Sequence, residues 1–167
     1  REAASKVFSS PEIEPTDKQQ VLDGLRAALY ASKVCSYAQG LSLIRAASDE
    51  HKWDISIAEC ARLWTGGCII QAKLLGHIQK AFSENQDLAN LLVDPGFTAE
   101  LNERSAAWRR TVALCVTSGV PCPALCSSLT YFDTYRRARL PASLTQAQRD
   151  FFGGHTYERT DTEGRFH

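Results

Sequence analysis

The sequence predicts an all-α fold: a compact domain of about six to seven helices around one long central helix, followed by an irregular C-terminal tail. Apolar residues recur at three- and four-residue spacing over most of the 167 residues, which is typical of amphipathic helices. No segment shows sustained alternation rich in β-branched residues, as strands would require. Hydrophobic residues make up 44% of the chain and charged residues 23%, a balance that supports one ordinary globular core.

The first 15 residues contain two prolines and mixed polarity, which indicates a linker or crossing segment. Thr16 and Gln19 then fit a capping box at the start of a helix that continues to about Ala47. Roughly 30 residues at about 1.5 Å each give a rod of about 45 Å. Alanine and serine are frequent along this helix, and small residues let neighbouring helices approach closely. We therefore expect it to be central.

Three further segments follow the long helix. Residues 54–64 predict a short helix, which the TGG sequence at 65–67 interrupts. Residues 68–82 are apolar over a wide arc, which predicts a helix buried between layers or at an interface. A short helix is expected at 88–93, ended by Pro95.

Thr98 begins a long amphipathic helix that stops near Gly119. Pro123 suits the first position of the next helix, and Ser143 can cap a last helix at 144–152. The apolar side chains expected to face inward on the helix after Pro123 are Leu125, Leu129, Phe132 and Tyr135. Residues 156–167 are polar and lack periodicity, so we predict a tail there, after an all-helical domain over 16–155.

Charge and cysteine content exclude several classes of protein. The 19 basic and 19 acidic residues give no net charge, which argues against disorder and against a nucleic-acid-binding protein held by phosphate contacts. No apolar run approaches the roughly 20 residues of a membrane span. The six cysteines lie in apolar helical patterns, so we expect reduced, buried thiols in a cytoplasmic protein. Cys122 and Cys126 are one helical turn apart but lack nearby histidines or a CxxC pair, which favours packing over a metal site.

The chain contains no methionine and begins with Arg1. The expectation is a piece of a longer protein, with a matured secreted protein as the alternative that the cysteine pattern disfavours.

Three groups of residues are candidates for a functional site. The TGGC sequence at 65–68 favours a tight helix junction over a phosphate-binding helix N-terminus, since it lacks the residues of a P-loop. His51 and His77 are expected to be structural or exposed. Arg149 and His155, near the end of the last helix and after a double glycine, can converge on one anion. On spacing alone, a surface charge is the favoured explanation of Arg149.

The sequence QAQRDFFGGHTYE at 146–158 resembles the C-terminal motif of decarboxylating 6-phosphogluconate dehydrogenases. Further segments resemble that family in the same order. They are ALYASKVCSYAQG (28–40), LWTGGCIIQAKLLGHIQKAF (63–82), SGVPCPALCSSLTYFDTYR (118–136) and LPASLTQAQRDFFGGHTYE (140–158). The similarity extends over about residues 20–158, and several blocks in one order are more specific than any single motif.

The resemblance implies the helical substrate-binding and dimerisation domain of an enzyme that converts 6-phosphogluconate to ribulose 5-phosphate and reduces NADP to NADPH. It further implies a homodimer in which Arg149 and His155 hold the phosphate of a substrate bound in the partner subunit. The NADP-binding Rossmann domain and the catalytic residues of the family are absent from this chain, so we expect no catalytic residue in it and no activity from it alone.

Two departures from the family qualify this interpretation. Thr65 and Gln71 stand where the family usually has arginine, and family members continue past residue 167 with a tail that helps close the partner's cofactor site. Two other functions stay open at this point. One is a purely structural dimerisation module, and the other is the domain of a related β-hydroxyacid dehydrogenase whose substrate carries no phosphate.

Overall fold

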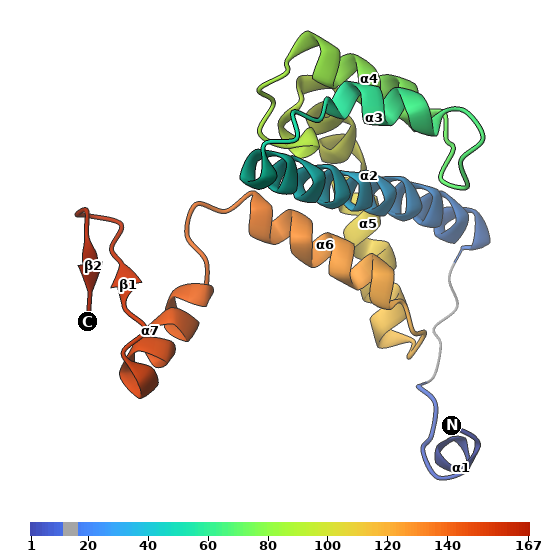
Figure 1. Ribbon diagram of the computed structural model, residues 1–167. Coiled ribbons are helices and arrows are strands. Elements are labelled where there is room, and N and C mark those ends of the chain that lie inside the picture. Colours follow the sequence, from blue (N-terminus) through green and yellow to red (C-terminus); the bar gives the residue numbers. More distant parts are fainter. Residues whose placement is uncertain (12–16) are drawn as a thin grey trace. The chain divides into compact units, whose positions relative to one another are not determined.

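The computed structural model describes residues 1–11 and 17–167 and divides into two compact units, Arg1–Tyr131 and Phe132–His167. The all-α prediction is confirmed (Figure 1): in the described residues the elements are helices, apart from two strands of two residues each. Within the segment predicted as a linker, Glu2–Ser5 form a single helical turn, α1.

The long helix α2 spans Lys18–His51, and its 34 residues make a rod of about 50 Å. Asp17 caps its first turn, because its side chain accepts a hydrogen bond of 2.8 Å from the Gln19 backbone N–H. The predicted cap, Thr16, lies outside the described residues. The helix continues beyond Ala47 to His51 and ends where Lys52 turns into the left-handed region at φ 56°.

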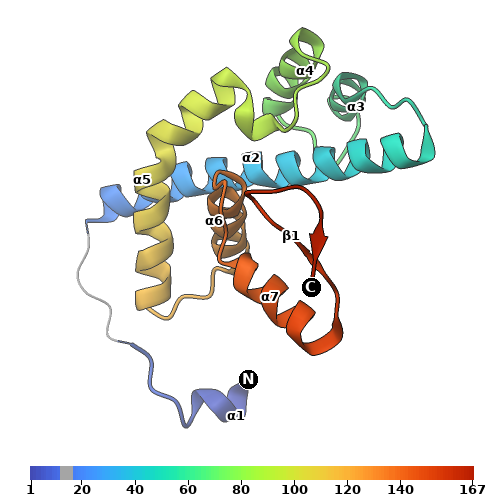
Figure 2. The ribbon, with the colours of Figure 1, turned by 90° about the vertical axis from the view of Figure 1, so that its left-hand side faces the viewer.

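The core of the first unit lies where α5 (Pro95–Thr117) crosses α2 (Figure 2). Ala28, Ala31 and Ala38 of α2 are 0% exposed, and so is Trp108 of α5. Helix α5 begins three residues before the predicted Thr98. Asp94 accepts a hydrogen bond from the Phe97 N–H, and Pro95 occupies the first position, where its missing N–H costs nothing. Pro95 therefore starts this helix instead of ending the preceding one.

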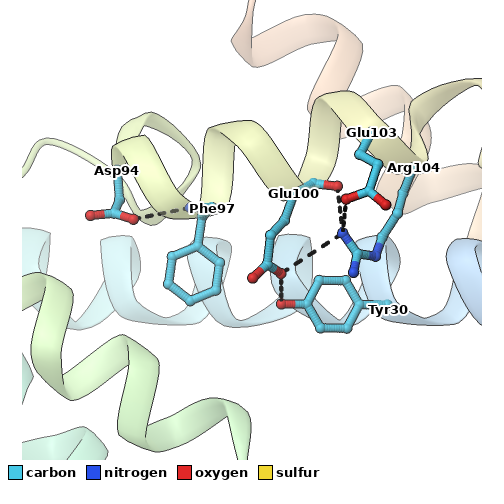
Figure 3. A network of polar contacts seen from close by, with 6 residues as sticks. All are labelled: Tyr30, Asp94, Phe97, Glu100, Glu103 and Arg104. Atoms are coloured by element: carbon cyan, nitrogen blue, oxygen red, sulfur yellow. Dashed lines mark hydrogen bonds and ion pairs between the residues drawn. The ribbon is translucent and has the colours of Figure 1, made fainter.

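A polar network links the two crossing helices (Figure 3). The Tyr30 hydroxyl of α2 donates to the Glu100 carboxylate of α5, and the Arg104 guanidinium lies 4.6 Å from the centre of the Tyr30 ring. Burial, followed by the hydrogen bond to Glu100, raises the pKa of Tyr30 to about 12. Tyr30 is thus held as a neutral donor between two oppositely charged side chains.

Helices α3 (Ile57–Trp64) and α4 (Leu74–Glu84) lie side by side in the same unit (Figure 1). The predicted start at Asp54 is wrong, because Ser56 caps α3 and accepts from the Glu59 N–H. The predicted helix over 68–82 is also wrong in its first half. Residues 68–73 form turns, and Ile69 is completely exposed, so apolar character there does not reflect burial in this chain.

The short helix predicted at 88–93 is a single 3₁₀ turn, η1 (Leu91–Val93). Asn90 precedes it and is almost fully buried. Its side-chain oxygen accepts from the Leu92 N–H at 2.8 Å, while its amide donates to Ser42 Oγ at 2.8 Å and to Tyr131 Oη at 3.0 Å. This residue satisfies the polar groups at the turn that redirects the chain into α5.

Helix α6 (Pro123–Tyr135) begins at Pro123 as predicted and spans the division between the units. The second unit continues with α7 (Ala142–Gly153) and with the antiparallel pair β1 (Tyr157–Glu158) and β2 (Arg165–Phe166).

Three details of this region differ from the predictions. Tyr135 is 41% exposed instead of facing inward, because the chain leaves α6 at that residue. Ser143 lies inside α7, whose first residue follows Pro141, so it is no cap. The predicted irregular tail contains a short ladder in which Tyr157 pairs with Phe166.

Candidate functional site

The C-terminal end of α7 turns sharply, and this turn positions the residues of interest. Gly154 adopts φ 60°, and its N–H donates to the Asp150 carbonyl at 2.8 Å, which ends the helix as the double glycine predicts. Thr156 also has a positive φ of 61°. Two left-handed residues so close together reverse the chain and leave His155 between them.

Asp150 holds this turn in place. Its side chain is only 10% exposed, although most of α7 faces solvent. One carboxylate oxygen accepts a hydrogen bond of 2.7 Å from the Thr156 N–H and lies 3.0 Å from His167 Nδ1. The hydrogen bond that the Asp150 carboxylate accepts from His167, together with the one it accepts from Thr156, lowers the pKa of Asp150. The carboxylate therefore stays charged and ties the loop and the chain end to the helix.

Gln146 adds a second tie one turn earlier in α7. Its side-chain amide donates to the Thr156 carbonyl at 2.8 Å, and its oxygen accepts from Arg149 Nη1 at 3.2 Å. Gln146 thus connects the backbone after His155 to the Arg149 guanidinium.

Arg149 and His155 line the same surface hollow, which has a volume of about 420 Å³. The other lining residues are Thr145, Gln148, Phe152 and Gly153. The His155 ring lies directly over Gly153, since a Cβ added to that glycine would stand 3.1 Å from ring atoms Cδ2 and Nε2. The absence of a side chain at Gly153 therefore lets the ring settle beside the helix end.

This arrangement suits a multiply charged anion. The guanidinium is a planar donor that matches phosphate or carboxylate oxygens, and an imidazole beside it can donate one more hydrogen bond. Both side chains are exposed, so they are accessible from solvent. Arg149 and His155 are the charged or titratable side chains among the residues that line the hollow.

Large apolar side chains lie beside the hollow and face solvent. Phe151 and Phe152 are 85% and 83% exposed, and Leu144 of the same helix is 70% exposed. Three such residues on one short helix form an apolar surface of the kind that binds another protein surface.

The other candidate positions fall elsewhere. Gly66 and Gly67 follow the C-terminus of α3, and α4 begins only at Leu74, so the TGGC sequence does not stand at a helix N-terminus. The alternative of a phosphate site there is wrong. Thr65 caps α3 by donating to the Arg62 carbonyl at 2.6 Å, and Gln71 lies in the following turns. His51 and His77 are exposed.

The cysteines are free, but only Cys35 is buried, so the prediction that they are all buried is wrong. Over the part of the chain that the structure describes, no three histidine, cysteine, aspartate or glutamate side chains gather in a way that could hold a metal ion. Within the same residues, no helix has both the length and the apolar character needed to traverse a bilayer.

Sequence reasoning missed Asp150, Gln146 and Gly153. Their roles depend on contacts made after the chain reverses, which no spacing along α7 reveals. One signal was present: Asp150 directly follows Arg149 and precedes the helix-ending Gly154 by four residues, which is the spacing of the backbone hydrogen bond that closes the turn.

The fold and the hollow define a class: an all-helical domain in which an arginine and a histidine line one surface hollow at the end of α7. The family profile described as "6-phosphogluconate dehydrogenase, C-terminal domain" matches residues 1–167. The chain belongs to this family.

Relatives and one solved structure agree with this assignment. The chain is 54% identical to 6-phosphogluconate dehydrogenase, decarboxylating 1, of Spinacia oleracea, covering 100% of this chain and 36% of that protein. It is 56% identical to the chloroplastic enzyme 1 of Arabidopsis thaliana, with 100% and 34% covered. The Plasmodium falciparum enzyme, solved apo, with its cofactor NADP⁺ and with its substrate 6-phosphogluconate, superposes with a TM-score of 0.91 at 38% identity, over 99% of this chain and 36% of that one. The chain thus spans about a third of the length of these relatives.

Proposed function

We propose that this chain is the helical substrate-binding and dimerisation domain of an enzyme that oxidatively decarboxylates 6-phosphogluconate to ribulose 5-phosphate and reduces NADP to NADPH. In this proposal Arg149 and His155 hold the substrate phosphate. The observation that carries it is their shared hollow at the end of α7. The Plasmodium falciparum relative is described with the substrate 6-phosphogluconate and the cofactor NADP⁺. The phosphate of such a substrate is an anion of the kind that the hollow could bind.

The phosphate is remote from the carbons that react, so its binding energy orients the substrate and takes no part in bond making. A charge-assisted hydrogen bond to a phosphate oxygen contributes about 1.5–3 kcal/mol. Arg149 can offer two parallel donors, and His155 adds a third from the loop that Asp150 fixes. We therefore expect loss of either residue to change KM more than kcat.

The described residues do not fit the dinucleotide. A dinucleotide site needs a strand, a glycine-rich turn and a helix N-terminus, and the strands in residues 1–11 and 17–167 are the two short ones of the tail. The proposal therefore assigns NADP binding and the proton-transfer groups to a part of the enzyme outside this chain. It follows that the chain by itself forms no NADPH.

A homodimer partner is part of the proposal. The exposed phenylalanines lie beside the hollow, so a surface that covers them would also bring Arg149 and His155 up to another subunit's site. A site shared in this way would be complete only in the dimer.

We also propose a cytoplasmic location, in keeping with the free cysteines. Recovery of the protein in an organelle fraction would contradict that location, which matters because relatives include chloroplastic enzymes.

A chimera tests the function directly. This chain would replace the matching C-terminal third of the spinach enzyme, and NADPH formation would be followed against 6-phosphogluconate concentration. We expect an active chimera in which Arg149→Ala raises KM by about 10- to 100-fold with kcat nearly unchanged. Arg149→Lys should recover part of the loss, because it restores the charge without the planar donor.

The matched control is Arg137→Ala, an exposed arginine of the same unit that does not line the hollow. It should leave KM unchanged. An Arg149→Ala chimera that behaves like this control would contradict the phosphate role and favour a purely structural dimerisation module. An inactive chimera beside an active spinach enzyme would contradict the function itself. Equal use of a substrate without the phosphate would favour a related β-hydroxyacid dehydrogenase.

A further inference from the structure

Two cysteine thiols meet at the start of α6. The Sγ atoms of Cys122 and Cys126 are 3.5 Å apart, within sulfur hydrogen-bond distance. The Cys122 carbonyl accepts a hydrogen bond of 3.1 Å from the Cys126 N–H, and Pro123 is the first helical residue. Cys122 thus stands at the edge of the helix, while Cys126 lies one turn inside it.

The thiols of Cys122 and Cys126 are more exposed to solvent than the buried thiol of Cys35. Both are half-buried, whereas Cys35 is 0% exposed, and burial raises the pKa of its thiol to about 12. Burial likewise raises the pKa of Cys60, which has no cysteine within sulfur hydrogen-bond distance among the contacts of the described residues. Small reagents from solution can therefore reach the Cys122–Cys126 pair.

The pair lacks the partners for a metal site. A structural zinc ion needs four converging ligands, and in the described ranges no third histidine, cysteine, aspartate or glutamate joins the two thiols. Two adjacent thiols without further ligands have one other common chemistry, which is oxidation to a disulfide.

The geometry permits that bond with a small movement. A disulfide requires the sulfur atoms to approach to about 2.0 Å. Cys122 precedes the first helical residue, and its carbonyl accepts from the Cys126 N–H, so the Cys122 side chain lies at the helix edge where it can move towards Cys126. The following residue is a proline, which has no N–H to lose.

We propose that Cys122 and Cys126 are a redox modification site, at which a low-molecular-weight disulfide such as glutathione disulfide oxidises the two thiols to an intramolecular disulfide. The Cys122 thiolate attacks one sulfur of glutathione disulfide, forms a mixed disulfide and releases one glutathione thiolate. The Cys126 thiolate then attacks the Cys122 sulfur and releases the second glutathione. Two protein thiols are oxidised and one glutathione disulfide is reduced to two glutathiones, so electrons and protons balance.

The order of the two attacks follows from the helix. Cys122 stands before the first helical residue, Pro123, whereas Cys126 lies one turn inside the helix, so Cys122 is the thiol at the helix edge. The hydrogen bond with Cys122 raises the pKa of Cys126, which keeps its proton longer. Cys122 is therefore the first nucleophile, and Cys126 resolves the mixed disulfide.

The experiment exposes the 167-residue chain to glutathione disulfide and measures the intact mass, with peptide mapping without reduction. The wild type should lose two hydrogen atoms, carry no glutathione, and yield a peptide linked between Cys122 and Cys126. Dithiothreitol should reverse the change. Cys126→Ser should instead retain one glutathione on Cys122, because the resolving thiol is gone. Cys115→Ser, which removes a half-buried cysteine outside the pair, should behave like the wild type.

Three results would overturn the proposal. One is a wild type that keeps glutathione on Cys122 under conditions that modify Cys126→Ser. Another is a map that links either residue to a different cysteine. The last is a wild type in which both thiols stay reduced while Cys115 reacts. Circular dichroism of every variant, recorded before oxidation, separates these results from loss of the fold.

Discussion

At Gly24, α2 lies close to α5, and a methyl group added there should have opposite effects on stability with and without the Thr111 side chain. A Cβ added to Gly24 would stand 2.5 Å from Thr111 Oγ1, which is far too close. Thr111 is 6% exposed, and its hydroxyl donates to the Ala107 carbonyl at 2.9 Å. The next nearest atoms lie at 3.9 and 4.0 Å, an ordinary contact. The Thr111 hydroxyl is therefore the one obstacle.

The magnitude follows from two opposing contributions. Replacing glycine by alanine inside a helix stabilises by about 1 kcal/mol. Forcing Thr111 to move costs about 1–3 kcal/mol of overpacking, and the loss of its hydrogen bond adds about 1 kcal/mol. Gly24→Ala should therefore lower the free energy of unfolding by about 1–3 kcal/mol. With Thr111→Ala in place the obstacle is gone, and Gly24→Ala should raise the free energy of unfolding by about 0.5–1 kcal/mol.

Urea unfolding of the four members of this cycle, followed by far-ultraviolet circular dichroism, measures both effects. Gly40→Ala is the matched control, because Gly40 lies in the same helix with nothing within 4 Å of the added Cβ. It should stabilise in either background. If Gly24→Ala stabilises the chain that retains Thr111, or if its effect is the same in both backgrounds, the close contact does not control the helix crossing and the reasoning fails.

Two further predictions concern titrating groups. Tyr30→Phe should lower the free energy of unfolding by about 1 kcal/mol at neutral pH, because it removes the donor to Glu100. Since the pKa of Tyr30 is raised to about 12, this stabilisation is present below pH about 10 and is lost as the pH rises to about 12, so urea midpoints of variant and wild type should converge there; a constant difference would contradict it. Asp150→Ala should speed amide exchange at Thr156 and raise the KM of the chimera roughly tenfold, whereas Asp150→Asn, which keeps an acceptor for Thr156, should do less. Because the pKa of Asp150 is lowered, slow exchange in the wild type should persist above the ordinary aspartate pKa and be lost as the pH falls through the lowered one; equal exchange in all three proteins would remove Asp150 from the site.

The placement of Arg149 and His155 shows how far sequence reasoning reached. The double glycine predicted the end of α7. The Arg–His spacing was compatible with one anion site, but on spacing alone a surface charge was the better explanation of Arg149. The hollow arises because Gly154 and Thr156 both take positive φ and Asp150 fixes the turn between them. Threonine rarely adopts a positive φ, so the turn at Thr156 could not be predicted from the sequence.

By itself the sequence determined the all-α class, the long central helix and the position of Pro123 at a helix start, because these depend on local periodicity and on backbone preferences. It also carried the family resemblance. Only the tertiary structure decided which apolar residues are buried: Ile69 follows the same pattern as its neighbours yet is fully exposed. It likewise decided that Gly24 is a contact point and that two cysteines one turn apart meet at 3.5 Å. Such features depend on contacts formed in the folded chain, which the spacing of residues along the sequence does not predict.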